Sequence, residues 1–483
     1  MAQKFRTLIG DWSTGTGPLY RRLAASIAAA IERGVVPVGE RMPSERAFAE
    51  ELAVSRRTVV AAYALLKSEG WLASREGSGT RTQRPASDGD VFHMPSDDGD
   101  AVLYSKLIGD KRGIIDLTLA ALPASPLIFD TLSQSGDDIA ALMARYHGYL
   151  PLGLPELRES IAGDFMRRGL PTHADDVLVT TGSQQAITLT ARLLARPGDA
   201  IAVENPTNPG ALDAFHQGRF DLVPLDVDSD GIAIDRLQER LTRRHPQLLY
   251  VTSSFHNPTG AVLSLPRRRA LLEICARLHV PIIDDLAMVD FSLGDSLPPP
   301  LAKLDTNGIV ITVGSADKLF WGGLRIGWAR APRSLIVRIG RLKSANDLGS
   351  SLISQLLTSK LLPLAERAKT LRSKELGASF ARAARGLREL LPSWKWEQPR
   401  GGLSLWIELP WGNAEQFSQI ALRHGVNVVP GSAFSVDGRH TQHLRLSCVA
   451  PAGEIDEGIR RLALAWETYQ RAHASASYAR PVI

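Results

Sequence analysis

The stretch GSADKLFWGGLRIGW, residues 314–328, decides the fold of the larger part of this 483-residue chain. It overlaps the end of an apolar, β-branched run, GIVITVGS (308–315), whose composition predicts a buried strand. Lys318 therefore lies just beyond a strand end, and Arg325 follows seven residues later in a glycine-rich segment. Ligands gather at the ends of strands in open α/β sheets, so this stretch indicates a ligand site.

Four further runs have the same character and end in polar or glycine-rich turns: DVLVTTG, AIAVEN, QLLYVTSS and VPIIDD. Helical patterns separate most of the runs between about Ile114 and residue 330. This alternation predicts an α/β domain with a mainly parallel sheet that helices cover.

The other strand ends carry a second set of polar motifs. The sequence Thr181-Gly182-Ser183-Gln184 follows one strand and opens a helix, where backbone N–H groups and a hydroxyl suit a phosphate. Asn257-Pro258-Thr259-Gly260 follows another strand, and Asp285 ends VPIIDD. Each motif alone has an ordinary alternative, such as a turn or a solvated charge. Their fixed order along one chain argues against coincidence.

These residue types are what pyridoxal phosphate requires. Lys318 would form the Schiff base, and Asp285 would face the pyridine nitrogen and keep it protonated, so that the ring withdraws electrons. Asn257 would donate to the phenolic oxygen. Arg binds a phosphate bidentately. The residues that we expect at the phosphate are Ser183, Gln184, Ser315 and Arg325.

From roughly residue 114 to 470 the chain resembles fold-type I (aspartate aminotransferase-like) enzymes. The motifs that carry the resemblance are LPLGLPELRESIA, VTTGSQQAI, HNPTG, IIDD, GSADKLFWGGLRIGW, PRGGLSLWIELP and HLRLS. The resemblance implies a smaller C-terminal α+β subdomain at roughly 345–470. It assigns Arg445 of HLRLS to the carboxylate of a substrate or effector. It also implies that Tyr146 or Tyr149 reaches the phosphate bound by a partner subunit.

Two positions depart from the pattern of this family. Many relatives carry an aromatic that stacks on the cofactor ring where this chain has Asn208, and a Tyr where it has Ala287. Losing one such ring contact lowers affinity by about tenfold at most. We therefore expect pyridoxal phosphate to bind, and we expect no efficient transaminase turnover beyond residual activity.

The net charge of +5 is confined to the N-terminal end of the chain. Residues 1–84 contain 13 Lys and Arg against 8 Asp and Glu, whereas the rest contains 43 of each. Such asymmetry indicates a module that binds nucleic acid, attached to a neutral body.

The periodicity of residues 1–84 predicts a winged helix-turn-helix. A first helix runs from Pro18 to Gly34 with Leu19, Leu23, Ile27 and Ile31 on one face, and Ser44 caps a short second helix. Ser55 caps a third helix, with Val59, Tyr63 and Leu66 facing inward, and a hairpin wing follows. The third helix would enter the major groove of double-stranded DNA. The residues that we expect at the DNA are Arg46, Ser55, Arg56, Arg57, Thr58, Arg75, Gly77 and Gly79, and Arg81 flanks the wing.

Residues 42–80, MPSERAFAEELAVSRRTVVAAYALLKSEGWLASREGSGT, resemble the DNA-binding domain of the GntR family, and the resemblance extends over roughly 18–82. A GntR-type head on an aminotransferase-like body (114–483) is the architecture of the MocR subfamily. That resemblance implies head-to-tail homodimers. Residues 85–113, rich in Asp, Gly, Ser and Pro, are predicted to be a linker.

Three functions are compatible with this organisation. The first is a transcription regulator that senses an amino compound, or pyridoxal phosphate itself, through an aldimine on Lys318. The second is a pyridoxal-phosphate-dependent aminotransferase carrying a DNA-binding head. The third is a DNA-binding protein whose second domain only dimerises. The intact head argues against the second, and the presence of Lys318, Asp285 and Asn257 argues against the third.

Cysteine content and hydropathy exclude other classes of protein. The two cysteines, Cys275 and Cys448, form neither a disulfide framework nor a metal motif, so we expect buried thiols and no metal. No apolar run reaches the roughly 20 residues that span a bilayer. The sequence therefore predicts a cytoplasmic protein without a membrane partner.

Overall fold

The computed structural model describes residues 18–75, 79–83, 113–294 and 296–478, together with Phe5, Leu8, Ile9 and Trp12. The chain divides into two compact units, Met1–Asp98 and Gly99–Ile483, and each has its own hydrophobic core. Apart from Gly113, the predicted linker lies outside the described residues. Within the part that is described, no helix is both long and apolar enough to cross a bilayer.

Among the elements of the N-terminal unit that are described in full are the helices α2 (Leu19–Glu32), α3 (Glu45–Glu51) and α4 (Arg56–Ser68) and a hairpin of β1 (Leu72–Arg75) and β2 (Gly79–Thr82). Both predicted caps are present, because Ser44 accepts a hydrogen bond from the Ala47 N–H at 3.3 Å and Ser55 accepts one from the Thr58 N–H at 3.2 Å. These caps satisfy backbone donors at the two helix starts and thereby fix the short turn between the helices.

The core of this unit confirms most of the predicted inward positions. Val59, Tyr63 and Leu66 of α4 are buried, and the Tyr63 hydroxyl donates to the Pro43 carbonyl at 3.0 Å. On α2, Leu23, Ile27 and Ile31 are buried, but Leu19 is 43% exposed. Leu19 is the first residue of the helix, and the predicted face is therefore buried only from Leu23 onward.

An eight-stranded sheet forms the centre of the C-terminal unit. Its order is β4-β11-β10-β9-β8-β5-β6-β7; the central pairs are parallel, whereas β11 and β7 run antiparallel to their neighbours. The strands are β4 (Val177–Thr180), β5 (Ala200–Asn205), β6 (Asp221–Asp228), β7 (Gly231–Ile232), β8 (Leu248–Val251), β9 (Ile282–Asp285), β10 (Val310–Ser315) and β11 (Gly327–Arg330). The mainly parallel α/β sheet is as predicted.

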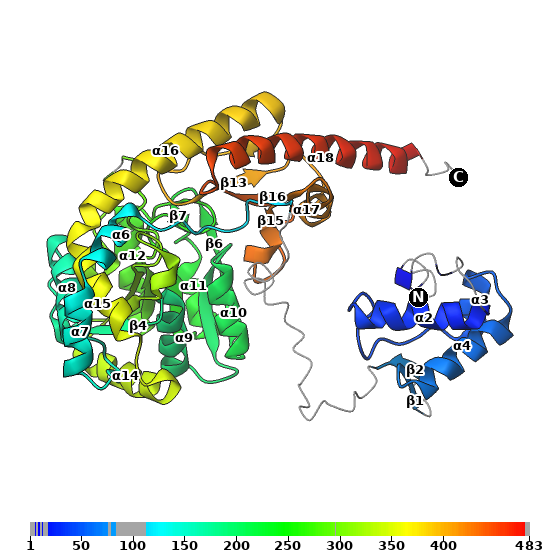
Figure 1. Ribbon diagram of the computed structural model, residues 1–483, viewed down its shortest axis with the longest axis horizontal. Coiled ribbons are helices and arrows are strands. Elements are labelled where there is room, and N and C mark those ends of the chain that lie inside the picture. Colours follow the sequence, from blue (N-terminus) through cyan, green and yellow to red (C-terminus); the bar gives the residue numbers. More distant parts are fainter. Residues whose placement is uncertain are drawn as a thin grey trace. The chain divides into compact units, whose positions relative to one another are not determined.

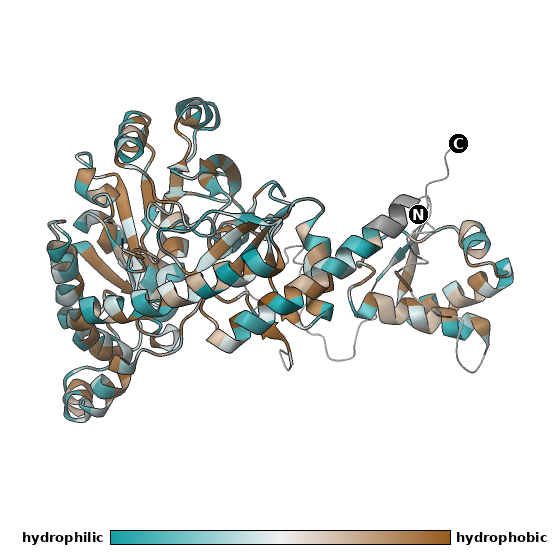
Figure 2. Cartoon of the chain, turned by 90° about the horizontal axis from the view of Figure 1, so that it is seen from above, coloured by the Kyte–Doolittle hydropathy of each residue, from teal (hydrophilic) through white to brown (hydrophobic). Residues whose placement is uncertain are grey.

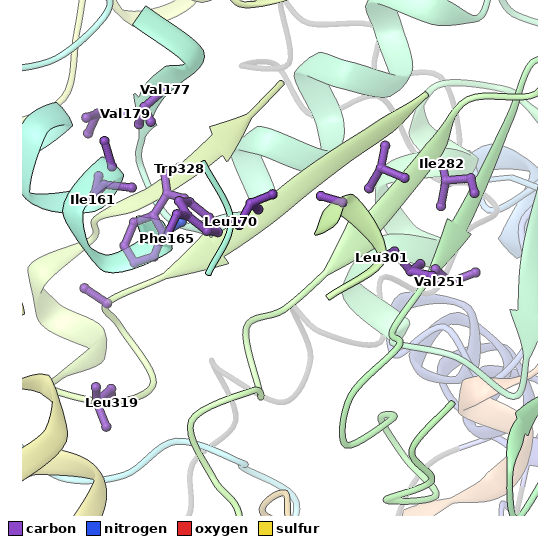
Figure 3. Packing of buried hydrophobic residues seen from close by; sticks show 14 of the residues in the cluster. Ile161, Phe165, Leu170, Val177, Val179, Val251, Ile282, Leu301, Leu319 and Trp328 are labelled. Carbon is purple, nitrogen blue, oxygen red and sulfur yellow. The ribbon is translucent and has the colours of Figure 1, made fainter. Parts of the chain in front are cut away.

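Helices cover both faces of this sheet (Figures 1 and 2). Alternate strand residues belong to opposite faces, since Val177 and Val179 of β4 pack in one core and Leu178 in the other. One face packs against α6 (Pro126–Ser133), α7 (Gly136–Arg145), α8 (Pro155–Arg167), α11 (Leu237–Arg244), α12 (Leu265–Arg277), α13 (Leu301–Leu304) and α15 (Leu352–Leu361). The other face packs against α9 (Ser183–Leu194), α10 (Pro209–Gln217) and α14 (Arg333–Asp347). Figure 3 shows the first face, where Ile161 and Phe165 of α8 lie near Trp328 of β11. Cys275 and Cys448 are buried free thiols.

A second, smaller core surrounds a four-stranded sheet of order β12-β13-β16-β15. Its strands are β12 (Lys395–Trp396), β13 (Ser404–Glu408), β15 (Val429–Pro430) and β16 (His443–Ser447), and its helices are α16 (Ala365–Leu390), α17 (Ala414–Arg423) and α18 (Ala452–Tyr478). Helices α16 and α18 lie side by side over it (Figure 1).

The segment that enters the C-terminal unit belongs to this second core. Strand β3 (Ile115–Asp116) pairs in parallel with β14 (Val426–Asn427), and Leu117 is fully buried. The chain then crosses from the smaller core to the large sheet, where α6 begins. Leu117, Ala120 and Leu122 still pack in the smaller core, so the chain crosses between the two cores after residue 122.

Candidate cofactor and DNA-binding sites

Lys318 lies immediately after β10, in a turn between the strand end and η2 (Gly322–Leu324). Its Nζ donates to the Ala120 carbonyl oxygen at 2.8 Å. Burial, and secondarily the positive charge of Arg445, lower the pKa of Lys318 to about 8. A larger fraction of this amine is therefore neutral, and able to react with an aldehyde, than of an ordinary lysine.

Asp285 ends β9 with its side chain on the same side as Lys318. Its Oδ1 accepts from the Ala287 N–H at 3.0 Å, and its Oδ2 accepts from the Tyr250 hydroxyl at 2.8 Å. Burial raises the pKa of Asp285, while these two donors and Lys318 oppose the rise. The preceding Asp284 points away, toward the Ser253 N–H and Arg268. Of this pair, Asp285 is the carboxylate whose oxygen pairs with Tyr250 and whose charge interacts with Lys318.

Asn257 and Arg445 meet across the two subdomains. An Arg445 Nη1 donates to Asn257 Oδ1 at 3.2 Å, and Nη2 donates to the Thr118 carbonyl oxygen. The guanidinium lies 4.9 Å from the centroid of the Phe434 ring, and its Nε has no hydrogen-bond partner. Burial lowers the pKa of Arg445 to about 10. A buried guanidinium with an unused donor is suited to a carboxylate.

One short segment contacts both cationic groups. The carbonyl of Ala120 accepts from Lys318, and the carbonyl of Thr118 accepts from Arg445. The carbonyl of Leu119, between them, accepts from the Ser447 hydroxyl at 2.9 Å. This segment, 118–120, therefore occupies the donors that a bound amino compound would use.

The phosphate cup, which we define as Gly182, Ser183, Ser315, Asp317 and Arg325, lies at the N-terminus of α9. No side chain caps α9, whose N-cap is Gly182 at a φ of +82°. This positive φ favours glycine, and a Cβ on Gly182 would lie 2.9 Å from an Arg325 nitrogen. Free N–H groups beside a guanidinium form an anion site.

Three predicted phosphate residues lie at this cup. Ser183 begins α9, the Ser315 hydroxyl accepts from the Asp317 N–H at 3.0 Å, and Arg325 donates to the Thr181 carbonyl at 3.0 Å. Gln184 differs, because its side-chain amide donates to the Gly210 carbonyl of α10. Only the backbone of Gln184 is left for a phosphate.

The donor set fits pyridoxal phosphate. A reactive lysine, a buried carboxylate and an amide lie near a glycine-lined cup that would hold the phosphate. Asn208, which stands in the place of the expected ring-stacking aromatic, caps α10 by accepting from the Gly210 N–H at 3.2 Å and accepts from Asn257 at 3.5 Å. Its amide is thus committed to the protein rather than to the face of a ring.

In the N-terminal unit, the start of α4 presents two arginines to solvent. Arg56 and Arg57 are exposed; Arg56 lies 3.5 Å from Glu45, and Arg46 is bonded to Glu50 at 3.2 Å. Ser55 and Thr58 share a hydrogen bond of 2.8 Å within the cap. Their side chains therefore support the helix start, and the arginines remain available to DNA.

The hairpin is described in part. Arg75 pairs with Gly79 in the register of β1 and β2, and Gly77 lies outside the described residues. Arg81 donates to the Gly39 carbonyl at 2.7 Å.

Tyr250 and Asp317 were not identified from the sequence. Tyr250 is the fourth residue of the run QLLYVTSS, and the alternation of β8 was a signal that its side chain shares a face with Asp285. Asp317 is adjacent to Lys318 in GSADK. The signal for its ion pair was Arg325, seven residues beyond Lys318.

Two families match separate parts of the chain. Residues 19–81 match "Bacterial regulatory proteins, gntR family", and residues 124–462 match "Aminotransferase class I and II". The HTH-type transcriptional regulator TauR of Rhodobacter capsulatus is 30% identical over 482 residues, covering 93% of this chain and 97% of the relative. The "Probable rhizopine catabolism regulatory protein MocR" of Rhizobium meliloti is 31% identical over 70% of each chain.

A solved structure is similar to the C-terminal unit. It is LysN, the α-aminoadipate aminotransferase of Thermus thermophilus, complexed with N-(5'-phosphopyridoxyl)-L-leucine. The TM-score is 0.69 at 26% identity, and the match covers 77% of this chain and 98% of that one. The chain therefore belongs to the MocR subfamily of GntR-family transcription regulators, in which a winged helix-turn-helix domain precedes an aminotransferase class I and II domain of the pyridoxal-phosphate-using fold.

Proposed function

We propose that this regulator holds pyridoxal phosphate at Lys318 and senses an amino compound that carries a carboxylate. The observation that carries the proposal is the arrangement of Lys318 and Arg445, which both donate to carbonyls of the segment 118–120. The two groups thus contact carbonyls two residues apart in the chain, which places them near each other, as the amine and carboxylate of an amino acid are.

When bound, pyridoxal phosphate supplies an aldehyde carbon that reacts with amines and a ring that withdraws electrons. Asp285 would face the ring nitrogen, and Tyr250 would orient Asp285 through its 2.8 Å hydrogen bond. Asn257 would donate to the phenolic oxygen. The lowered pKa of Lys318 favours the neutral amine that attachment to the aldehyde needs.

An effector would replace the contacts made by the segment 118–120. The effector's carboxylate would accept hydrogen bonds from Arg445, including one from the Nε, which has no partner among the described residues. Arg445 would then release the Thr118 carbonyl. Since the segment 118–120 packs in the smaller core and its Ala120 carbonyl contacts Lys318 beyond the end of β10, this exchange would shift the smaller subdomain relative to the large sheet. A ligand acts on DNA binding only to the extent that it prefers one arrangement of the protein, so this shift is the step that couples the sites.

The proposal also includes a homodimer, which brings two DNA-binding heads to DNA. Several large apolar side chains on and near α6 and α7 are exposed, including Phe129, Met143 and Tyr149. An exposed apolar surface of this kind marks an interaction site. Tyr149, rather than the half-buried Tyr146, is free to reach a partner's phosphate in a head-to-tail pair.

The contacts of Asn208 and the small side chain of Ala287 favour the sensing of an amine over catalytic turnover. Asn208 is committed to α10 and to Asn257, and Ala287 provides no hydroxyl at the phenolic oxygen. We infer that the site binds an amine without efficient transamination.

The test is DNA binding by fluorescence anisotropy, using genomic fragments that the purified protein selects. Wild type, Lys318→Ala, Arg445→Ala and the exposed control Lys374→Ala are titrated with DNA in the presence of pyridoxal phosphate and a panel of amino acids. We expect at least one amino acid to change the DNA affinity of wild type and of the control. Lys318→Ala should bind DNA normally and show no response. A response that persists in Lys318→Ala would refute the role of Lys318.

A further inference from the structure

The phosphate cup contains a carboxylate as well as cationic donors. Asp317 Oδ2 accepts from Arg325 Nη1 at 3.0 Å, and Oδ1 accepts from the Ile326 N–H at 2.9 Å. A Cβ built on Gly182, the N-cap of α9, would lie 3.0 Å from Asp317 Oδ2. The carboxylate therefore lies against the helix N-terminus where the phosphate is expected.

Asp317 pairs with the positive charge that a bound phosphate would otherwise pair with. Arg325 is the guanidinium of the cup, and it is already paired with Asp317. A phosphate ester is mostly a dianion at neutral pH, because its second pKa is about 6. Two anions that share a site do not both stay fully ionised, and one of them takes up a proton.

No other group nearby removes this conflict. Arg325 and Lys318 are the charged groups that act on Asp317. The first turn of α9 (Ser183, Gln184) carries no charge. On α14, Lys343 forms an ion pair with Asp347. Asp347 accepts a hydrogen bond from the Gln185 amide, and the amide oxygen of Gln185 accepts from the Thr181 N–H beside the cup.

We propose that Asp317 makes binding of the cofactor's phosphate depend on the uptake of one proton. The proton comes from solvent and is held between Asp317 and a phosphate oxygen, so that the complex carries one negative charge fewer than its separated parts. The inference rests on the proposed function, which places the phosphate in this cup. Its consequence is that the regulator releases its cofactor more readily as the pH rises.

The linkage has a definite sign and size. Above about pH 7, the free phosphate and free Asp317 have both lost the shared proton, while the complex retains it. The dissociation constant should therefore rise about tenfold per pH unit, the slope for one proton. Lys318, whose pKa is about 8, adds its own pH dependence in every variant that keeps it. The difference between wild type and an Asp317 variant therefore isolates the effect of Asp317.

The experiment uses the full chain and pyridoxine 5'-phosphate, which has no aldehyde and so does not bond to Lys318. Isothermal titration calorimetry at pH 8 in two buffers of different ionisation enthalpy counts the protons taken up. The variants are Asp317→Asn, whose amide oxygen can still accept from the Ile326 N–H, and Asp317→Ser. The matched control is Asp456→Asn, which removes a distant ion pair with Arg382 on the smaller subdomain. Unphosphorylated pyridoxine controls for ring binding.

We expect wild type and Asp456→Asn to take up close to one proton. Asp317→Asn should take up about one proton fewer than wild type, bind at least tenfold more tightly at pH 8, and show a weaker pH dependence than wild type. The difference in proton uptake between wild type and an Asp317 variant is the proton assigned to Asp317, and Asp317→Ser supplies that difference if Asp317→Asn does not fold. A wild-type protein that binds without proton uptake, or with the same pH slope as Asp317→Asn, would overturn the inference.

The outcomes separate this inference from the proposed function. If pyridoxal phosphate attaches to Lys318 but no proton is taken up, the role of Asp317 is wrong and the function stands. If pyridoxine 5'-phosphate binds to no variant, the cup does not hold a phosphate and both are contradicted.

Discussion

Lys318 differs from a solvated lysine because burial and Arg445 both disfavour its charged form. Only the neutral amine attacks an aldehyde, so attachment of pyridoxal phosphate should speed up with rising pH and level off above about pH 8. Arg445→Gln removes a positive neighbour and should move this midpoint to higher pH. Stopped-flow absorbance between pH 6 and 10 measures it, with Arg382→Gln as the control. A midpoint that does not move would show that Arg445 exerts no field on Lys318.

Tyr250 supports the carboxylate that faces the cofactor ring. Tyr250→Phe removes a buried hydrogen bond to Asp285 and leaves that oxygen short of a donor, at a cost of about 1–3 kcal/mol in the free energy of unfolding. Urea denaturation followed by fluorescence measures this loss. Tyr149→Phe, at an exposed tyrosine, should leave stability unchanged. Equal stability of the two variants would contradict a supporting role for Tyr250.

At the scale of elements, the sequence predicted the strands β4, β5, β8, β9 and β10, because each is an apolar run closed by a polar or glycine-rich turn. Strands β6 and β11 were not identified. Strand β6 lies near the sheet edge and contains charged residues among its apolar ones. Strand β11 is short and includes glycine and alanine. Their assignment depends on pairing with neighbours, which one-dimensional periodicity does not contain.

The site shows the same division between local and long-range information. Lys318, Asp285 and Asn257 follow from strand ends, since their positions depend on local chain order. The contacts of Thr118 and Ala120 join residues 327 and 198 positions apart in the chain. They involve backbone carbonyls that carry no signature in the sequence.

Helix α4 is the element that we expect to read DNA. Arg56→Ala should weaken binding to a selected fragment by about 1–3 kcal/mol if Arg56 contacts a base. Lys67→Ala, in the last turn of the same helix, is the control. Anisotropy titrations over a range of salt concentrations distinguish the roles, because loss of a phosphate contact lowers the salt slope by about one. An unchanged affinity and an unchanged slope would remove Arg56 from the interface.

At the scale of the whole molecule, the proposed function brings two heads to DNA and therefore predicts a dimer. Met143 on α7 is 70% exposed, and we expect a partner subunit to cover it. Met143→Asp places a charge in that interface and should convert a dimer to a monomer in sedimentation velocity. Leu464→Asp, at an exposed site on α18, should leave the dimer intact. A Met143→Asp protein that remains dimeric would place the interface elsewhere.

The central claim is that Lys318 carries the cofactor of a sensing domain. The most direct measurement is mass spectrometry of the peptide containing Lys318, after incubation with pyridoxal phosphate and reduction with borohydride, alongside loss of the visible-edge absorption band. The account predicts a phosphopyridoxyl group on Lys318 in wild type, and no band and no modified peptide in Lys318→Ala. An unmodified Lys318 in a protein that stays colourless with added pyridoxal phosphate would contradict it.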